Sequence, residues 1–388
     1  MTLTAEFDST LSASARDAIA RAATFAAAHV APNAKSWEYE RRQPVETLRA
    51  ACAAGLHTLE LDPRHGGQGL PFSCKMRAVE EISRHDMGFA FSLINHHNAL
   101  TRFARDGQPS IVARLLPRML TGEVIGCAGL TEPWVGSDFA SIRTSARRVD
   151  GGWRIDGAKA WITNAANCGM SQIYAQTDPS LGHRGIACFV VEADRPGFVR
   201  EPAFELHGGH AIGAGGFRLE GYVAPEDALI APPGQAFKMA LAGINGARTY
   251  VAAMCCGMLE ASIATAVKYG AGRPLFGGKV MDFQGQRWSM VDALNDLEAM
   301  RLLTYRAARL IDAGADAQEA AAHAKKFAGD RTVAHIAACV QAMGANGLRA
   351  DYPLMRHLSC AKIACYTDGS TEIQNERLGQ VLMARFGV

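Results

Sequence analysis

The sequence predicts an α+β protein, mostly α, with an N-terminal helical domain, a middle antiparallel β-domain and a C-terminal four-helix bundle. Three observations support this fold class. The chain has 388 residues, 48% of them hydrophobic and 20% charged, which is typical of a globular protein of about two or three domains. Apolar residues recur at helical spacing in the first and last thirds. Short β-branched and aromatic runs occupy the middle third. We expect domains at residues 1–122, 123–232 and 233–388.

In the first domain, apolar residues three and four positions apart predict helices over Ala18–His29, Glu46–Gly55 and Lys75–Arg84. The segment Asp62–Gly69 is rich in Gly and Pro, so we expect a loop between two helices.

Adjacent histidines within this domain raise the question of a metal site. His96 and His97 point in different directions if they lie on a helix, so we expect one packed and one solvated side chain rather than a metal pair. We expect no metal site in the chain.

In the second domain, short runs separated by Gly, Asn and Asp predict antiparallel strands. The hairpin turn between two of them is expected at Asp150–Gly152. The predicted strands are Gly126–Leu130, Gly152–Asp156, Gln172–Gln176, Ile186–Val191 and Gly216–Leu219.

In the third domain, long helical stripes separated by short connections predict an antiparallel bundle. A third helical segment follows the two stripes, from Gln318 towards Gln341. The first stripe is Val251, Met254, Cys255, Met258 and Leu259, and the second is Val291, Leu294, Leu297, Met300 and Leu303.

Charge and motif content exclude several classes of protein. The net charge of +2 and the lack of a Lys/Arg block argue against nucleic acid or a membrane surface as a partner. We find no apolar run near the roughly 18 residues that span a bilayer and no secretory signal, and we expect a cytoplasmic protein. Ten Cys without a Cys-x-x-Cys pair favour reduced thiols. No glycine-rich motif of the Rossmann or P-loop type follows a strand and opens a helix.

Five short segments carry the candidate chemistry. Singly, each also has a structural interpretation, because a strand Trp is often core and a glycine often ends a helix. Trp161 and Thr163 are two residues apart and are expected on one face of a strand. The segments are Leu130–Asp138, Lys159–Asn164, Arg273–Gly278 with Gln284 beyond it, Gln341–Gly347 and Tyr366–Gln374.

In this order and spacing, the five segments resemble the acyl-CoA dehydrogenase flavoprotein family over nearly the whole chain. The loop Asp62–Gly69 also resembles that family's Tyr-Gly-Gly-x-Gly loop, with His65 at the aromatic position. The resemblance implies FAD as cofactor, in a cleft between the β-domain and the C-terminal bundle. It also implies that a second subunit completes the cofactor site, in a homodimer or homotetramer.

The resemblance assigns the cofactor-binding residues to three parts of the chain. Thr131 and Ser137, with Leu130 beside them, match hydroxyl-bearing positions at the flavin and pyrophosphate, and Trp161 and Thr163 match positions at the isoalloxazine. Ser370 and Glu372 match positions beside the adenosine half. The residues that would reach the FAD of a neighbouring subunit are Arg273, Phe276, Gln284, Gln341 and Gly344.

The implied reaction is α,β-dehydrogenation of an acyl thioester, with a carboxylate as base and the flavin as hydride acceptor. The family usually has Glu at the base position, where this chain has Asp368; the alternative base position on the first bundle helix holds Ala247. Arg248 matches a substrate-binding cation, and Asn245 replaces an Asp that helps to hold CoA, so a carrier-protein thioester is also considered. The implied electron acceptor is an electron-transfer flavoprotein or another acceptor.

Asp is one methylene shorter than Glu, so three roles remain open for Asp368. It is a base in a reshaped pocket, a base for a different carbon acid as in nitroalkane-oxidase-like relatives, or a turn residue. The corresponding alternatives to a dehydrogenase are a flavin oxidase or N-hydroxylating monooxygenase of the same superfamily, and a non-catalytic flavoprotein.

Overall fold

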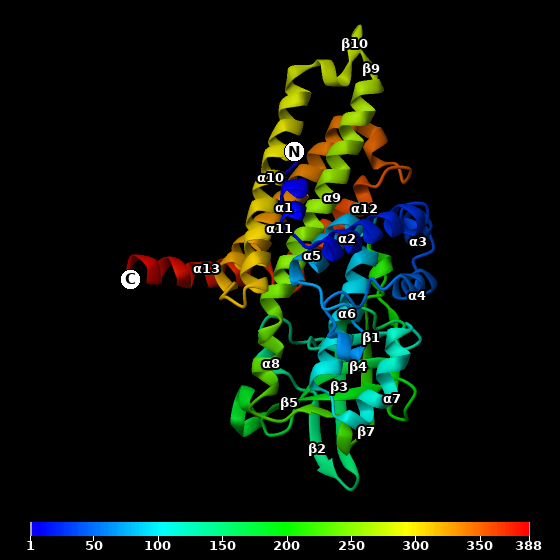
Figure 1. The fold of residues 1–388 in the computed structure, drawn as a ribbon, viewed down its shortest axis with the longest axis vertical. Helices are drawn as coiled ribbons and strands as arrows, with labels where there is room; N and C mark the ends of the chain where they lie inside the picture. Colours follow the sequence, from blue (N-terminus) through cyan, green and yellow to red (C-terminus); the bar gives the residue numbers. More distant parts are fainter. Residues whose placement is uncertain (1, 388) are drawn as a thin grey trace.

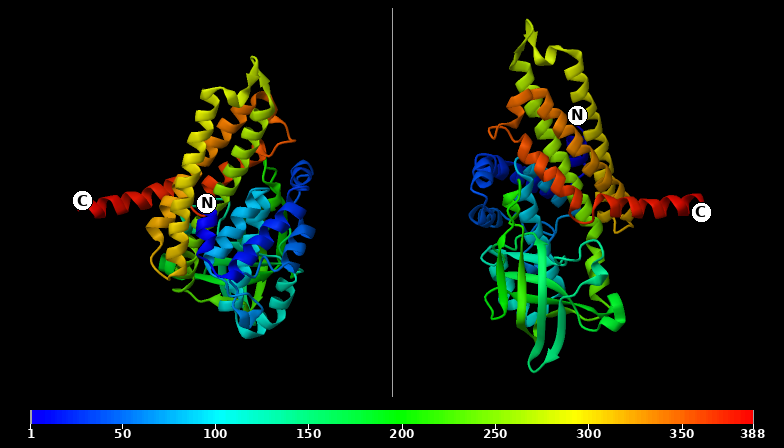
Figure 2. Two further views of the ribbon diagram at one scale, coloured as in Figure 1. Left: turned by 45° about the horizontal axis from the view of Figure 1, so that its top comes forward. Right: turned by 180° about the vertical axis from the view of Figure 1, so that it is seen from behind.

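The computed structural model describes residues 2–387, which fold into the three parts expected from the sequence. The sheet forms one end of the molecule and the C-terminal helices the other, with the N-terminal helices packed between them (Figure 1). Helix α13 projects sideways from the body in every view (Figures 1 and 2). The fold class is confirmed. The limits assigned between the domains stay a prediction.

Polar side chains cap the N-termini of several helices in the N-terminal domain. The side chains of Ser12 and Asp86 accept hydrogen bonds from backbone N–H groups in the first turns of α2 and α6. The elements are α1 (Leu3–Ser9), α2 (Ala13–Phe25), the π-helical η1 (Ala26–Val30), α3 (Ala34–Tyr39), α4 (Val45–Ala53), the 3₁₀ turn η2 (Pro63–His65), α5 (Phe72–Ser83), α6 (Met87–Asp106) and α7 (Pro109–Leu120).

The middle domain is an eight-stranded sheet with the order β6-β7-β3-β2-β4-β5-β8, and β1 pairs with β4. The β2–β3 hairpin turns at Asp150 and Gly151, as predicted. Most strand pairs are antiparallel, as expected, but β4 runs parallel to β1 and to the first residue of β2. The strands are β1 (Gly126–Gly129), β2 (Ser145–Val149), β3 (Gly152–Ile162), β4 (Met170–Gln176), β5 (Ile186–Glu192), β6 (Phe198–Ala203), β7 (Gly215–Pro225) and β8 (Leu229–Ala231). The 3₁₀ turns are η3 (Phe139–Ser141), η4 (Pro179–Gly185), η5 (His210–Ile212) and η6 (Glu226–Ala228).

In the C-terminal domain, helix α9 is the core helix and packs against α10, α11, α12 and the N-terminal helix α5. A two-stranded hairpin joins α9 to α10 at the tip of the molecule (Figure 1). The elements are α8 (Ala236–Ala242), α9 (Ile244–Gly272), β9 (Pro274–Leu275), β10 (Gly278–Lys279), the 3₁₀ turn η7 (Val280–Asp282), α10 (Gln284–Asp312), α11 (Gln318–Met343), the 3₁₀ turn η8 (Gly344–Leu348), α12 (Leu354–Tyr366) and α13 (Thr371–Phe386).

The two predicted apolar stripes of the bundle differ in burial. Every residue of the α9 stripe is buried, as expected. On α10, Leu297 and Met300 are buried, but Val291 and Leu294 are exposed. The α10 stripe is therefore only partly buried within one chain.

One helical stretch, Ala236–Gly272, is long and apolar enough to cross a membrane by length and composition alone. The sequence-based statement that no apolar run approaches that length is therefore too strong. Two thirds of its most apolar window (67%) is buried inside the fold, as in the core helix of a bundle.

Candidate functional site

The first group of candidate residues lies on the loop after β1 and at the end of β3. The backbone N–H of Ala160 donates to the carbonyl oxygen of Thr131 at 3.0 Å, which holds this loop beside Trp161. Thr131 is half-buried and Ser137 is exposed, so their hydroxyls can reach a bound molecule. The structure therefore brings Leu130, Thr131 and Trp161 together.

The predicted alternation of Trp161 and Thr163 along one strand face is wrong. The pairing of β3 with β7 shifts register between Lys159 and Ile162, and Trp161 has a φ of 59° at this bulge. Thr163 follows the last residue of the strand. The bulge turns the indole outward, where it is 62% exposed and packs against Phe204 at a centroid distance of 4.6 Å.

A buried ion pair that the sequence did not reveal fixes the loop after β1. Lys159 Nζ lies 2.9 Å from Glu132 Oε1, and both side chains are fully buried. Glu132 also accepts hydrogen bonds from the backbone N–H groups of Arg143 and Thr144 and from the indole of Trp134. Burial acts to raise the pKa of Glu132, but Lys159 and these donors outweigh it, so the pKa is lowered and the carboxylate stays ionised.

The candidate base lies in the turn between α12 and α13. Asp368 and Gly369 both have positive φ, 53° and 94°, and Asp is among the residues that tolerate this region. A Cβ on Gly369 would come within 2.8 Å of Gln374 Nε2, so only glycine fits the position without rearrangement. The turn is further held by Lys325, whose Nζ donates to the carbonyl oxygen of Ala364 at 2.6 Å.

Asp368 faces a phenol and two cations. Tyr250 Oη donates to Asp368 Oδ2 at 3.4 Å. Burial raises the pKa of the Asp368 carboxyl above its usual range, while Lys325, Tyr250 and Arg248 act in the opposite direction. A carboxylate with a raised pKa, held in a fixed turn, has the properties expected of a general base.

Arg248 and Asn245 lie at the start of α9, and the guanidinium of Arg248 is close to this turn. Arg248 is 3% exposed, and its Nε and Nη1 atoms have no hydrogen-bond partner among residues 2–387. Asn245 Oδ1 is likewise buried without a partner in that range. Because a buried charge without partners is costly, these atoms point to a polar ligand that is not part of the chain.

Ser370 and Glu372 lie at the first turn of α13. The Ser370 hydroxyl caps this helix by accepting from the N–H of Ile373. Glu372 is exposed in the first turn of α13, the helix that projects from the body of the molecule (Figure 1). Their assignment to the adenosine half of the cofactor stays a prediction.

The remaining cofactor candidates lie elsewhere in the single chain. Arg273 and Phe276 are in the hairpin at the tip, and Phe276 is 91% exposed. Gln284 begins α10 beside this hairpin, and Gln341 and Gly344 lie at the nearby end of α11. Figure 1 shows this tip at the opposite end of the molecule from the sheet. One chain therefore does not bring all of these residues together.

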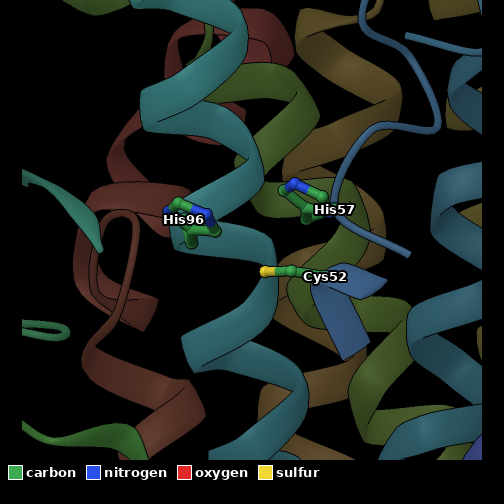
Figure 3. A group of neighbouring side chains, drawn as sticks. All are labelled: Cys52, His57 and His96. Atoms are coloured by element: carbon green, nitrogen blue, oxygen red, sulfur yellow. The ribbon is translucent and has the colours of Figure 1, made fainter. Parts of the chain in front are cut away.

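Cys52, His57 and His96 form a buried cluster whose potential ligand atoms lie within 4.8 Å of one another (Figure 3). His96 is committed at both nitrogens, since Nδ1 accepts from the N–H of Gly126 and Nε2 contacts the carbonyl oxygen of Met119 at 3.1 Å. Burial lowers the pKa of His57 to about 4 and raises that of Cys52 to about 12. The cluster therefore consists of the stacked, neutral imidazoles of His57 and His96 beside a protonated thiol, and its ring nitrogens are not arranged to bind a metal ion.

The expected difference between His96 and His97 is also wrong, because both are buried. His97 Nε2 accepts from the backbone N–H of Glu60 at 3.3 Å, which gives the second imidazole an interior partner.

Comparison with known proteins identifies the family of each of the three domains. Models of the N-terminal, middle and C-terminal domains of acyl-CoA dehydrogenases match residues 12–123, 127–222 and 234–383. An acyl-CoA dehydrogenase of Bacillus subtilis is 31% identical over 366 residues, covering 92% of this chain and 95% of the relative.

Two solved structures are similar over nearly their full length. Butyryl-CoA dehydrogenase from Megasphaera elsdenii has a TM-score of 0.92 and 28% identity, covering 96% of this chain and 99% of that one. PigA, solved with FAD and proline, has a TM-score of 0.90 and 25% identity, covering 97% and 99%. Fold and relatives define an oxidoreductase that acts on CH–CH groups. The chain belongs to the acyl-CoA dehydrogenase family.

Proposed function

We propose that the protein is an FAD-dependent acyl-CoA dehydrogenase in which Asp368 removes the α proton of an acyl thioester. FAD, when bound, would supply the hydride acceptor for the β hydrogen. The observation that carries the proposal is the Asp368 turn. It holds a carboxylate with a raised pKa beside the buried cation Arg248, whose Nε and Nη1 atoms have no hydrogen-bond partner among residues 2–387. Such a pair can accept a proton at the carboxylate while the cation meets the polar end of the substrate.

The residues at the end of β3 fit a flavin. Trp161 presents a large exposed indole at a bulge, beside Thr131, which is half-buried; Ser137, further along the same loop, is exposed. A planar apolar wall with a few aimed donors is what an isoalloxazine and a pyrophosphate require. We assign Leu130, Thr131, Ser137, Trp161 and Thr163 to the cofactor.

We propose that a second subunit completes the site, in a homodimer or homotetramer. The β9–β10 hairpin, where Arg273 and Phe276 lie, is at the opposite end of the molecule from the sheet that includes β3 and Trp161 (Figure 1), so these residues would contact the same FAD only from another chain. Exposed apolar side chains offer surfaces for such an assembly, because patches of this kind commonly mark interfaces. They are Trp288, Val291 and Leu294 on α10 and Leu382, Met383 and Phe386 on α13.

Replacing Phe276 with serine is expected to lower the FAD content of the purified protein while leaving the fold of each chain intact. The reason is that this side chain is 91% exposed in the single chain, so its replacement removes few packing contacts there. FAD per chain, measured from the flavin absorbance, is expected to fall at least several-fold. The matched control is Tyr39→Ser, an exposed aromatic residue of the N-terminal domain, which is expected to keep its FAD.

Replacing Arg248 with methionine is expected to raise KM for an acyl-CoA by about 10- to 100-fold, since hydrogen bonds to charged groups are worth about 1.5–3 kcal/mol. FAD content is expected to stay unchanged. Steady-state kinetics with a panel of chain lengths measures the effect. An unchanged KM would remove Arg248 from the substrate site.

A second candidate is oxidation of a substrate other than a thioester, by a flavin oxidase or N-hydroxylating monooxygenase. Two observations favour it: Asp368 stands where Glu is usual, and PigA has been solved with proline as well as FAD. Oxygen consumption with amines, amino acids or nitroalkanes, together with none with thioesters, would support this candidate. Slow reoxidation by oxygen and fast reoxidation by an electron-transfer flavoprotein would support the dehydrogenase.

The test of the proposed function is anaerobic flavin reduction. The purified protein is mixed with acyl-CoAs of different length and branching, and the flavin absorbance is followed. Bleaching by at least one thioester is expected. Bound FAD that no acyl-CoA bleaches would reject the proposal for CoA substrates, and acyl-carrier proteins would then be tested in the same way.

A further inference from the structure

A chain of hydrogen bonds leads from the N-terminal domain to Asp368. Lys75 on α5 has its Nζ 3.3 Å from Asn98 Oδ1 on α6. Asn98 Nδ2 lies 3.3 Å from Tyr250 Oη on α9, and Tyr250 Oη lies 3.4 Å from Asp368 Oδ2. Helices α5, α6 and α9 pack against one another, so the chain crosses the boundary between two domains.

The chemistry of the groups fixes the direction of every bond. An ammonium can only donate, so the side-chain oxygen of Asn98 must face Lys75. The Asn98 NH₂ group then faces Tyr250 and donates to the phenol oxygen. Because that oxygen is already accepting, the phenol hydrogen is free for Asp368, which accepts it best as a carboxylate.

We propose that Tyr250 is a positioning residue for the base, oriented by Asn98 and Lys75 so that its hydroxyl always donates to Asp368. The proposal rests on the proposed function, in which Asp368 is the base. Two effects follow. The carboxylate is held in one orientation, and its ionised form is favoured against the burial that opposes it.

The charges around this chain act with it. Asp368 faces Arg248 on α9 and Lys325 on α11, and both favour its ionised form. Arg377 on α13 lies near Arg248, and Arg102 on α6 lies near Tyr250. Lys75 is itself ion-paired with Glu60, whose side chain is partly exposed, and this contact fixes the far end of the chain of hydrogen bonds in place.

The proposal predicts a specific change in pH dependence. Asp368 must be ionised to accept a proton, so kcat/KM rises with pH through the pKa of Asp368. This rise is the acid limb of the pH profile. Tyr250→Phe removes the donor to the ionised form and is expected to move this acid limb up by about one pH unit. Asn98→Asp is expected to move it in the same direction, because a carboxylate at that position would take the phenol hydrogen and add a negative charge.

The matched control is Tyr305→Phe. Tyr305 is also a buried phenol that donates to a carboxylate, Glu80 Oε2 at 3.0 Å, but Glu80 is not part of the site. This variant is expected to lower stability without moving the acid limb. A limb that stays in place in Tyr250→Phe or in Asn98→Asp would overturn the proposal.

A second readout needs no turnover. Since burial raises the native pKa of Asp368, ionising it in the folded protein costs stability, and stability falls as pH rises through that pKa. The melting-temperature difference between wild type and Tyr250→Phe is therefore expected to be constant at low pH and to widen above the wild-type pKa. In an Asp368→Asn background the difference is expected to lose its pH dependence.

The pH profile of kcat/KM and the melting temperature together distinguish a failure of the proposed dehydrogenase function from a failure of the Tyr250–Asp368 coupling. If no thioester is turned over but the pH-dependent difference in melting temperature is found, the proposed function fails and the Tyr250–Asp368 coupling stands. If thioesters are turned over and neither the limb nor the melting temperature responds as described, the coupling is wrong and the dehydrogenase stands. All melting temperatures are measured at one protein and one FAD concentration, because bound cofactor shifts them.

Discussion

Asp368→Asn is expected to lower kcat/KM with an acyl thioester by about 10³-fold, within the range that a general base contributes. The amide has the shape of the carboxylate and can still accept from Tyr250 Oη, so the turn and the FAD content are expected to stay intact. Stopped-flow flavin reduction measures the effect, because it isolates the step in which the proton and hydride leave the substrate.

Asp368→Glu is the matched comparison for this substitution. It keeps a carboxylate but moves it by about one methylene, and a displacement of about 1 Å can cost up to about 10²-fold. Glu is therefore expected to retain more activity than Asn. If Asp368→Asn reduced flavin at the wild-type rate, Asp368 would be a turn residue and the base would lie elsewhere.

Lys159→Met is expected to lower the free energy of unfolding by about 3–5 kcal/mol, because it leaves the buried carboxylate of Glu132 without its cation. The side chain of Lys159 is fully buried, and a methionine fills a similar volume, so loss of packing contributes little. The loop after β1 depends on Glu132, so FAD affinity is expected to fall as well. Denaturant unfolding and a flavin titration measure the two effects.

Arg148→Met is the control for Lys159→Met. Arg148 also pairs with a glutamate, Glu226, but both side chains are more than half exposed. Exposed ion pairs contribute about 0–1 kcal/mol, so a small change is expected. Equal effects of the two substitutions would mean that the buried pair does not hold the loop.

The order of helical, β and helical domains was predictable because hydrophobic periodicity is local and strong in this chain. The stripe on α9, with Val251 and Met258, is fully buried as expected. The burial of the α10 stripe agrees less well with the prediction, because Val291 and Leu294 are exposed in one chain. Periodicity reports that a face is apolar, but it does not report whether the same chain or another covers it.

The errors arise where long-range contacts override local patterns. Trp161 does not follow the regular alternation of side chains along a strand, because the pairing of β3 with β7 shifts register there. Such a shift depends on both strands. Parallel pairing of β4 with β1 is likewise a property of distant segments. His97 is buried, and its ring accepts a hydrogen bond from the N–H of Glu60, a contact that the neighbouring sequence does not indicate.

The candidate base was predictable only through resemblance, since an Asp-Gly pair by itself predicts a turn. What surrounds Asp368 was not predictable. Tyr250 and Lys325 are far from it in sequence, and nothing in their local pattern distinguishes them from ordinary core and surface residues. The same holds for the pair of Glu132 and Lys159. These contacts come from packing between helices, strands and loops that lie in one domain but are distant in the sequence.

The most direct test of the central claim, that Asp368 is the base of a thioester dehydrogenase, is a crystal structure of the FAD-loaded protein with a bound acyl-CoA. The expected result is an Asp368 carboxylate oxygen within about 3–3.5 Å of the substrate α carbon, on the face of the thioester opposite the flavin. A different carboxylate at that position, or Asp368 turned away from the acyl chain, would contradict the claim.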